Sequence, residues 1–157
     1  MKFTKGYWMN LPGVTNTDAV QVREVKVEND RVYLYTVPYH ADMRAMGGPL
    51  LEMYISSPQP DIIRTEAYHF MGSNQKMPAF ELNDAHCALE VENTETTVTI
   101  KSGNTKLVIG KNPCSFDYYY KDKKLTSIGN RFGNAMISTI STPDGNYMRA
   151  QMNLDIG

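Results

Sequence analysis

Four acidic side chains are the residues with which this sequence could carry out acid–base chemistry: Asp61, Glu66, Asp117 and Asp155. Hydrolysis of a glycosidic bond, for example, needs two carboxyl groups, one as the acid and the other as the base or nucleophile. Carboxylates on alternating strands usually belong to the solvated face, and no spacing in the sequence singles out a pair. We therefore expect no catalytic residue within this chain.

The histidines give little support for a metal site. His40, His69 and His86 match no zinc-ligand spacing, and the adjacent His86 and Cys87 would point to opposite faces of a strand. His69 is in phase with Ile63, as is typical of a strand histidine that is hydrogen-bonded in the interior or at the rim of a sandwich. We expect neither a metal nor an organic cofactor.

Motifs for nucleophilic or nucleotide chemistry are also missing. The sequence has no G-x-S-x-G elbow, no H-E-x-x-H and no phosphate-binding glycine loop, and residues 129–133 form only a turn-rich connector. Trp8 and the ten tyrosines could instead give flat, amphipathic platforms for sugar rings. The run Tyr118–Tyr120 is also typical of a central strand that is covered on both faces, and we favour this second interpretation.

Composition indicates a single globular domain. A chain of 157 residues with 16 basic and 17 acidic residues has no broad positive field for nucleic acid, and no apolar run approaches the roughly 20 residues that span a bilayer. Cys87 and Cys114 are too few for a disulfide scaffold and are expected to be free, buried thiols in a reducing compartment. The N-terminal residues lack the apolar region of a secretory signal, so we expect a cytoplasmic protein.

Alternation of apolar and polar residues predicts the elements that must position these side chains. Residues 51–55, 87–91, 97–101 and 148–156 alternate in this way, and we expect each to be a strand with one buried face. Turn residues predict hairpins at 29–30, 102–104 and 122–123, and a slip in the apolar phase predicts a β-bulge near Arg23 or Glu24. The sequence therefore predicts an all-β, antiparallel β-sandwich that spans residues 1–157 as one domain.

Several short segments, read in order, carry a family resemblance. They are Gly6–Met9 with Pro12–Val14, the strand at 20–28, Tyr54–Pro58, Ile63–Arg64 with His69–Phe70 and Gly72, Lys101–Asn104, and Leu154–Gly157. Together they resemble the N-terminal region of family 31 glycoside hydrolases, most closely the α-xylosidase branch.

This resemblance implies a fold and a place in a larger enzyme. The N-terminal domain of the family is a sandwich similar to galactose mutarotase, and it precedes a (β/α)8 barrel whose two aspartates act as nucleophile and general acid/base. This chain carries neither aspartate. The last strands of the family's sandwich would lie beyond Gly157, so we expect the sandwich to be incomplete at its C-terminal end.

The resemblance implies a non-catalytic domain of a retaining α-glycosidase that hydrolyses terminal α-linked xylose or glucose from oligosaccharides. The domain would pack on the catalytic barrel, shape the rim of the active site and contribute to contacts in a homo-oligomer; neither nucleic acid nor a membrane is an expected partner. The alternative is a stand-alone carbohydrate-binding β-sandwich module. The residues expected at the interface are Tyr7, Trp8, Tyr39, His40, Arg44 and Met46.

Overall fold

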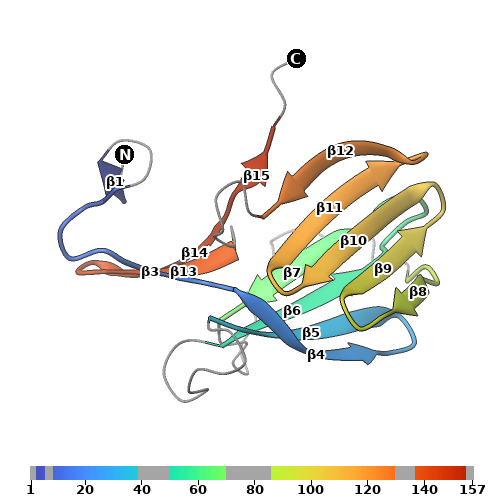
Figure 1. The fold of residues 1–157 in the computed structure, drawn as a ribbon, viewed down its shortest axis with the longest axis horizontal. Coiled ribbons are helices and arrows are strands. Elements are labelled where there is room, and N and C mark those ends of the chain that lie inside the picture. The colour runs from blue at the N-terminus through green and yellow to red at the C-terminus, as the bar shows by residue number, and fades with distance from the viewer. Residues whose placement is uncertain (1–2, 6–8, 39–49, 70–85, 130–136, 155–157) are drawn as a thin grey trace.

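Antiparallel strands make up the regular structure of this chain. The computed structural model describes residues 3–5, 9–38, 50–69, 86–129 and 137–154, and no helix occurs among them (Figure 1). The strands are β1 (Thr4–Lys5), β2 (Met9–Asn10), β3 (Thr15–Asp18), β4 (Gln21–Val27), β5 (Arg31–Val37), β6 (Leu51–Ser56), β7 (Arg64–Tyr68), β8 (Glu90–Asn93), β9 (Thr97–Ser102), β10 (Thr105–Lys111), β11 (Cys114–Tyr120), β12 (Lys123–Ile128), β13 (Ile137–Thr142), β14 (Gly145–Ala150) and β15 (Met152–Asn153).

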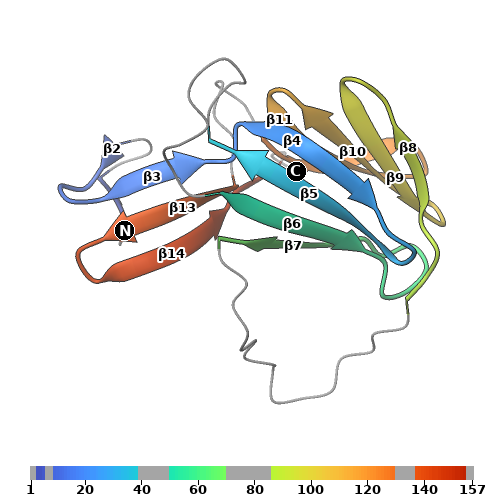
Figure 2. The same ribbon diagram turned by 90° about the horizontal axis from the view of Figure 1, so that it is seen from below.

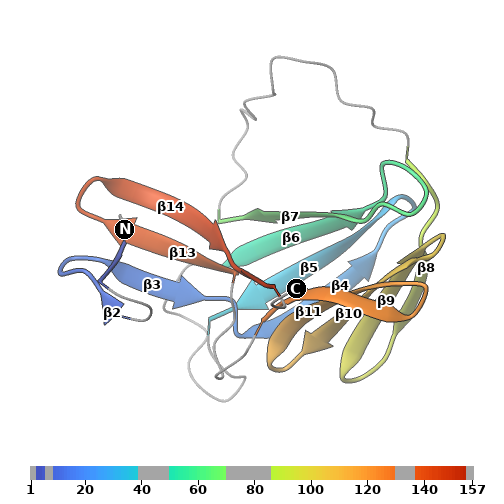
Figure 3. The same ribbon diagram turned by 90° about the horizontal axis from the view of Figure 1, so that it is seen from above.

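Two sheets form the sandwich, and a third lies at its end. One sheet has the strand order β4-β5-β6-β7 and the other has the order β15-β12-β11-β10-β9-β8. The three-stranded sheet β14-β13-β3 extends away from one end of the β4–β7 sheet, as Figures 2 and 3 show from opposite sides. The Ala19 amide donates a hydrogen bond of 2.8 Å to the Ile137 carbonyl, where the chain leaves this small sheet for β4. The expected all-β sandwich is confirmed.

The core lies between the inner faces of the two larger sheets. Because side chains alternate along a strand, every second residue of β5, β6, β9, β10 and β11 points into this layer. Burial of one such aliphatic or aromatic side chain contributes about 1.5–3 kcal/mol. The fully buried apolar residues of this layer include Val32, Leu34, Met53, Ile55, Val98, Ile100, Leu107, Ile109 and Phe116.

Turn chemistry fixes the register of the hairpins as the sequence predicts. Strands β9 and β10 meet at Ser102 and Thr105, and Gly103 takes a positive φ of 56° in the turn between them. The β11–β12 turn contains Lys121 and Asp122, both also with positive φ. The β4–β5 ladder shifts register between Val22 and Glu24, so the predicted bulge is confirmed.

The C-terminal run differs from the prediction. Residues 148–156 were expected to form one strand with a buried apolar face, but β14 ends at Ala150, and β15 pairs with β12 in another sheet. Met152 is 50% exposed and Leu154 is 80% exposed. In this register Tyr147 pairs with the buried Ile140, so the two side chains lie on the same face of the sheet. The more buried face of β14 is therefore the one with its aromatic and charged residues. The alternation in the sequence had predicted that the face with the methionine would be buried.

Two leucines test the location of the core. Leu107 is fully buried on β10 and Leu125 is 55% exposed on β12. We expect Leu107→Ala to lower the free energy of unfolding by about 2–5 kcal/mol, because the lost methyl groups leave a cavity. Leu125→Ala should change it by less than about 0.5 kcal/mol. Urea unfolding followed by circular dichroism measures both, and equal effects would contradict this assignment of the core.

Candidate functional site

The expected interface residues cannot be placed. Residues 6–8 and 39–49 lie outside the described part of the chain, and they contain all six expected positions. The interface assignment therefore stays a prediction. Those six positions are Tyr7, Trp8, Tyr39, His40, Arg44 and Met46.

Each of the candidate catalytic carboxylates in the described part of the chain is bound by its own structural partner. Glu66 accepts a hydrogen bond of 3.0 Å from the Tyr68 hydroxyl, and Asp117 forms an ion pair of 2.7 Å with the Lys124 ammonium. Asp155 lies outside the described residues. Among the residues that the structure describes, no group of three His, Cys, Asp or Glu side chains could hold a metal ion.

Asp61 connects two turns of the fold by hydrogen bonds. It lies between β6 and β7, and its carboxylate accepts hydrogen bonds from the backbone amide of Asn104 and, at 3.3 Å, from the Asn104 side-chain amide. Its carbonyl accepts a third hydrogen bond of 2.6 Å from the Thr105 hydroxyl. A Cβ on Gly103 would displace this carboxylate, and the positive φ at this position also favours glycine. Asp61 therefore ties the two large sheets together at one end.

The thiols are free, but they differ in burial. Cys114 is buried, and desolvation raises the pKa of its thiol to about 12. Cys87 is half-buried, in contrast to the expectation that both thiols would be buried. Its backbone amide donates a hydrogen bond of 2.9 Å to the Ser57 carbonyl. Neither thiol has a partner that would activate it as a nucleophile in the described structure.

The tyrosines on the outer face of the β4–β7 sheet pack against one another. Tyr33, Tyr54 and Tyr68 form a row with centroid separations of 5.3 Å and 6.1 Å, at tilted and edge-on angles. The Lys26 ammonium lies 5.3 Å from the centroid of Tyr33, and the Arg31 guanidinium lies 4.8 Å from that of Tyr54. A cation therefore already lies over the ring of Tyr33 and over that of Tyr54, which leaves less of these two rings open for stacking on a ligand.

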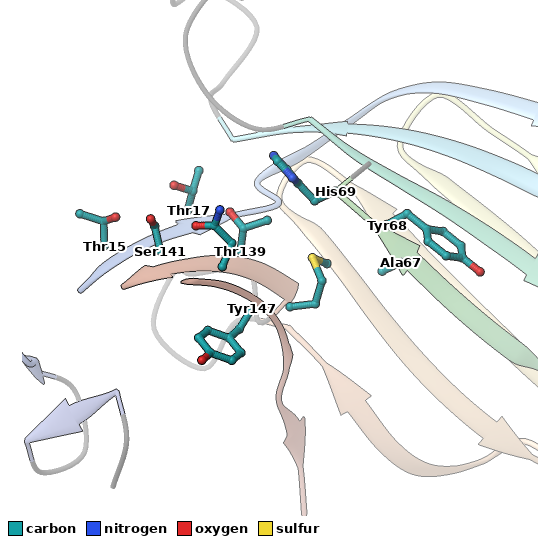
Figure 4. Close-up of a pocket in the computed structure, with 10 residues that line it drawn as sticks. Thr15, Thr17, Ala67, Tyr68, His69, Thr139, Ser141 and Tyr147 are labelled. Atoms are coloured by element: carbon teal, nitrogen blue, oxygen red, sulfur yellow. The ribbon is translucent and has the colours of Figure 1, made fainter. Parts of the chain in front are cut away.

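A polar cleft lies where the three-stranded sheet meets the end of β7 (Figure 4). Its volume of about 680 Å³ is within the range of small-molecule sites. We call it the hydroxyl cleft. Its lining residues are Thr15, Thr17, Ala67, Tyr68, His69, Thr139, Ser141, Asn146, Tyr147 and Met148.

The strand register explains why hydroxyl groups gather in this cleft. Thr17 pairs with Thr139 and Thr15 pairs with Ser141, and partners in an antiparallel ladder point to the same face of the sheet. Figure 4 shows these four side chains on one side of the small sheet and Tyr147 on the other. None of the four hydroxyls has a hydrogen-bond partner among the described residues. Other hydroxyls have partners within the fold, for example those of Thr36, Thr65 and Thr126.

His69 is found at the rim of this cleft. It comes directly after the last residue of β7 and is exposed, so it is not the strand histidine that the sequence predicted. Sequence reasoning missed the hydroxyl residues of the cleft. The only available signal was the recurrence of Thr or Ser at every second position in 15–17 and 139–141.

Comparisons with known proteins agree on the class of domain. No family model matches the chain. Over 99% of its length the chain is 23% identical to alpha-xylosidase XylQ of Lactiplantibacillus pentosus, and it spans 20% of that relative.

Solved structures show the same fold at lower identity. The cycloalternan-forming enzyme from Listeria monocytogenes, solved with a pentasaccharide substrate, superposes with a TM-score of 0.61 at 16% identity, over 88% of this chain and 12% of that enzyme. A GH31 dextranase of Flavobacterium johnsoniae gives a TM-score of 0.56 at 12% identity, over 73% and 13% of the two chains. The expected resemblance to family 31 glycoside hydrolases is confirmed as a similarity in sequence to an alpha-xylosidase and in fold to a GH31 dextranase.

The two thiols should differ sharply in reactivity. With a pKa of about 12, Cys114 has almost no thiolate at pH 8, and its side chain is also shielded from reagents. We expect Ellman's reagent to label one thiol quickly in the folded chain and the second only after unfolding. Cys87→Ser should remove the fast phase. Rapid labelling that persists in Cys87→Ser would show that Cys114 is accessible.

Proposed function

We propose that this chain is the non-catalytic N-terminal β-sandwich domain of a retaining α-glycosidase. The observation that supports the proposal is the sequence similarity along 99% of the chain to one-fifth of an alpha-xylosidase. The whole enzyme would be a cytoplasmic α-xylosidase or related α-glucosidase, and it would release terminal α-linked xylose or glucose from oligosaccharides. Catalysis would belong to a barrel carried elsewhere in the protein.

The polar contacts of the domain favour a structural role over catalysis. A retaining glycosidase needs two carboxyl groups about 5–5.5 Å apart, on either side of the scissile bond. Here Asp61 holds a turn, Glu66 accepts a bond from a tyrosine, and Asp117 is neutralised by a lysine. Each carboxylate already has the partner that its position in the fold provides.

Exposed apolar side chains give the domain a surface for packing on the barrel. Leu125 on β12 and Met152 on the neighbouring β15 are both exposed, and Leu154 comes directly after β15. Apolar side chains gathered at the surface mark contact sites with other protein parts. We propose that this edge of the six-stranded sheet packs on the barrel or on another subunit, while the segments at 6–8 and 39–49 approach the active-site rim.

The stand-alone carbohydrate-binding module is the second candidate. The hydroxyl cleft favours it, because a neutral cleft rich in hydroxyl groups suits a sugar with or without an attached barrel. In the part of the chain that the structure describes, no helix is long and apolar enough to cross a membrane. The two candidates differ in whether the reading frame of the gene continues beyond the codon for Gly157.

The gene sequence and a hydrolysis assay test the main proposal. We expect the reading frame to continue past the codon for Gly157 into a barrel with two catalytic aspartates. The full-length product should hydrolyse an aryl α-xyloside or α-glucoside with retention at the anomeric carbon, as NMR of the first-formed sugar would show. The 157-residue chain should give no turnover, because Asp61, Glu66 and Asp117 are each bound by a structural partner.

An aryl β-glucoside is the control substrate for the same assay. A stop codon after Gly157 would overturn the domain proposal and favour the stand-alone module. Turnover by the 157-residue chain itself would also overturn it, provided that an Asp or Glu substitution in the chain abolishes the activity.

A further inference from the structure

We propose that the hydroxyl cleft binds a neutral α-linked oligosaccharide, at a place on the domain that carries no catalytic group. The inference deepens the proposed function, since it takes its ligand from the substrate class proposed there. It rests on the chemistry of the cleft lining, on the unpaired state of the hydroxyls and on the cleft's position at a junction between sheets.

The lining selects against charged ligands. None of the ten lining residues is Lys, Arg, Asp or Glu. A phosphate or carboxylate ligand normally requires a guanidinium, an ammonium or a helix N-terminus, and a cation requires carboxylates. The cleft provides hydroxyl groups, one side-chain amide and one imidazole. These groups suit a ligand that is itself a neutral array of donors and acceptors.

Hydroxyl groups on the small sheet are arranged as a grid. Thr15 and Thr17 project from one strand, and their partners Thr139 and Ser141 project beside them from the next. Directly opposed side chains in an antiparallel pair have Cβ atoms about 4.5–5.5 Å apart, so neighbouring hydroxyls can each bond a different group of one sugar ring. A hydroxyl donates one bond and accepts two, which lets each of them adapt to a donor or an acceptor on the ligand.

The cleft also provides apolar surface for the C–H face of a sugar. Met148 pairs with Thr139 and therefore shares its face, and its side chain is 42% exposed. Ala67 of β7 lines the opposite wall. A pyranose has polar edges and apolar faces, so a cleft that combines the hydroxyls and the Met148 thioether on the small sheet with the Ala67 methyl group on β7 matches both.

Position explains why such a cleft exists at this point of the fold. The three-stranded sheet is joined to the sandwich through Ala19 and Ile137, and its hydroxyl face lies beside the end of β7 instead of against the core. The fold tolerates polar side chains on this face because none of them is part of the apolar core. A ligand held there would bridge two sheets that touch mainly at their ends.

Titration of the 157-residue chain with defined trisaccharides tests the proposal. We expect maltotriose or isomaltotriose to shift the ¹⁵N–¹H signals of residues that line the cleft in a saturable way, and cellotriose to bind at least tenfold more weakly. Thr17→Val, Thr139→Val and Ser141→Ala, combined in one variant, should weaken binding at least tenfold. Each substitution removes a hydroxyl while keeping nearly the same shape.

Two controls protect the result against effects on folding. Thr99→Val changes a half-buried threonine on the outer face of β9, where its hydroxyl has no partner among the described residues, and it should leave binding unchanged. Thr139→Val alone should weaken binding without lowering the unfolding midpoint. If the triple variant does not fold, sugar binding by the Thr139→Val variant alone tests the proposal.

The outcomes separate this inference from the proposed function. Absence of saturable shifts, equal binding of cellotriose, or unchanged binding in both Thr139→Val and the triple variant would overturn the cleft assignment. An active full-length α-glycosidase together with any of these results would reject only the cleft. Cleft-specific binding by a chain whose full-length product is not a glycosidase would instead reject the proposed function and retain the sugar site.

Discussion

Burial of one apolar layer between two sheets is the constraint on which the rest of this structure depends. Most of the layer consists of alternating residues of β5, β6, β9, β10 and β11, with Val22 of β4 and Ile128 of β12 added at its edges. A shift of one residue in any of these strands would turn its apolar side chains toward water. A bulge at Arg23 accommodates the change in apolar phase along β4, and a second register shift occurs between β11 and β12 at Tyr118 and Tyr119. The hairpin turns then serve to keep the strands in this register.

Polar contacts between the sheets fix their relative position at the edge of the apolar layer. The hydroxyls of Ser57 and Ser102 lie 2.7 Å apart and are both buried, and those of Thr65 and Tyr118 lie 3.0 Å apart. Asp61 adds a further link to the β9–β10 turn. Each of these groups is paired, so none carries the large cost of a buried polar atom without a partner. The same pairing makes these groups unavailable for chemistry.

The sequence was sufficient for the sandwich because alternation and turn residues are local signals. Val32 and Leu34, or Ile100 and Leu107, show which face is buried without any knowledge of the partner strand. The prediction for the C-terminal run was wrong because the pairing with β13 determines which face of β14 is buried. Tyr147 pairs with the buried Ile140 and lies on its face, although Met148 favours burial of the opposite face. Strand β3 has no apolar alternation at all, so its existence depended on pairing with β13.

The same reasoning explains why the hydroxyl cleft was invisible in the sequence while the tyrosines were conspicuous. A threonine is informative only when its partner is known, since Thr36 or Thr65 satisfies an internal bond whereas Thr17 and Thr139 do not. Tyrosines are candidates for sugar stacking by residue type alone, yet the rings of Tyr33 and Tyr54 are already in contact with a lysine and an arginine. Capacity to bind a ligand depends on groups that the fold leaves unpaired. In the described part of this chain, one such set lines the junction between β7 and the three-stranded sheet.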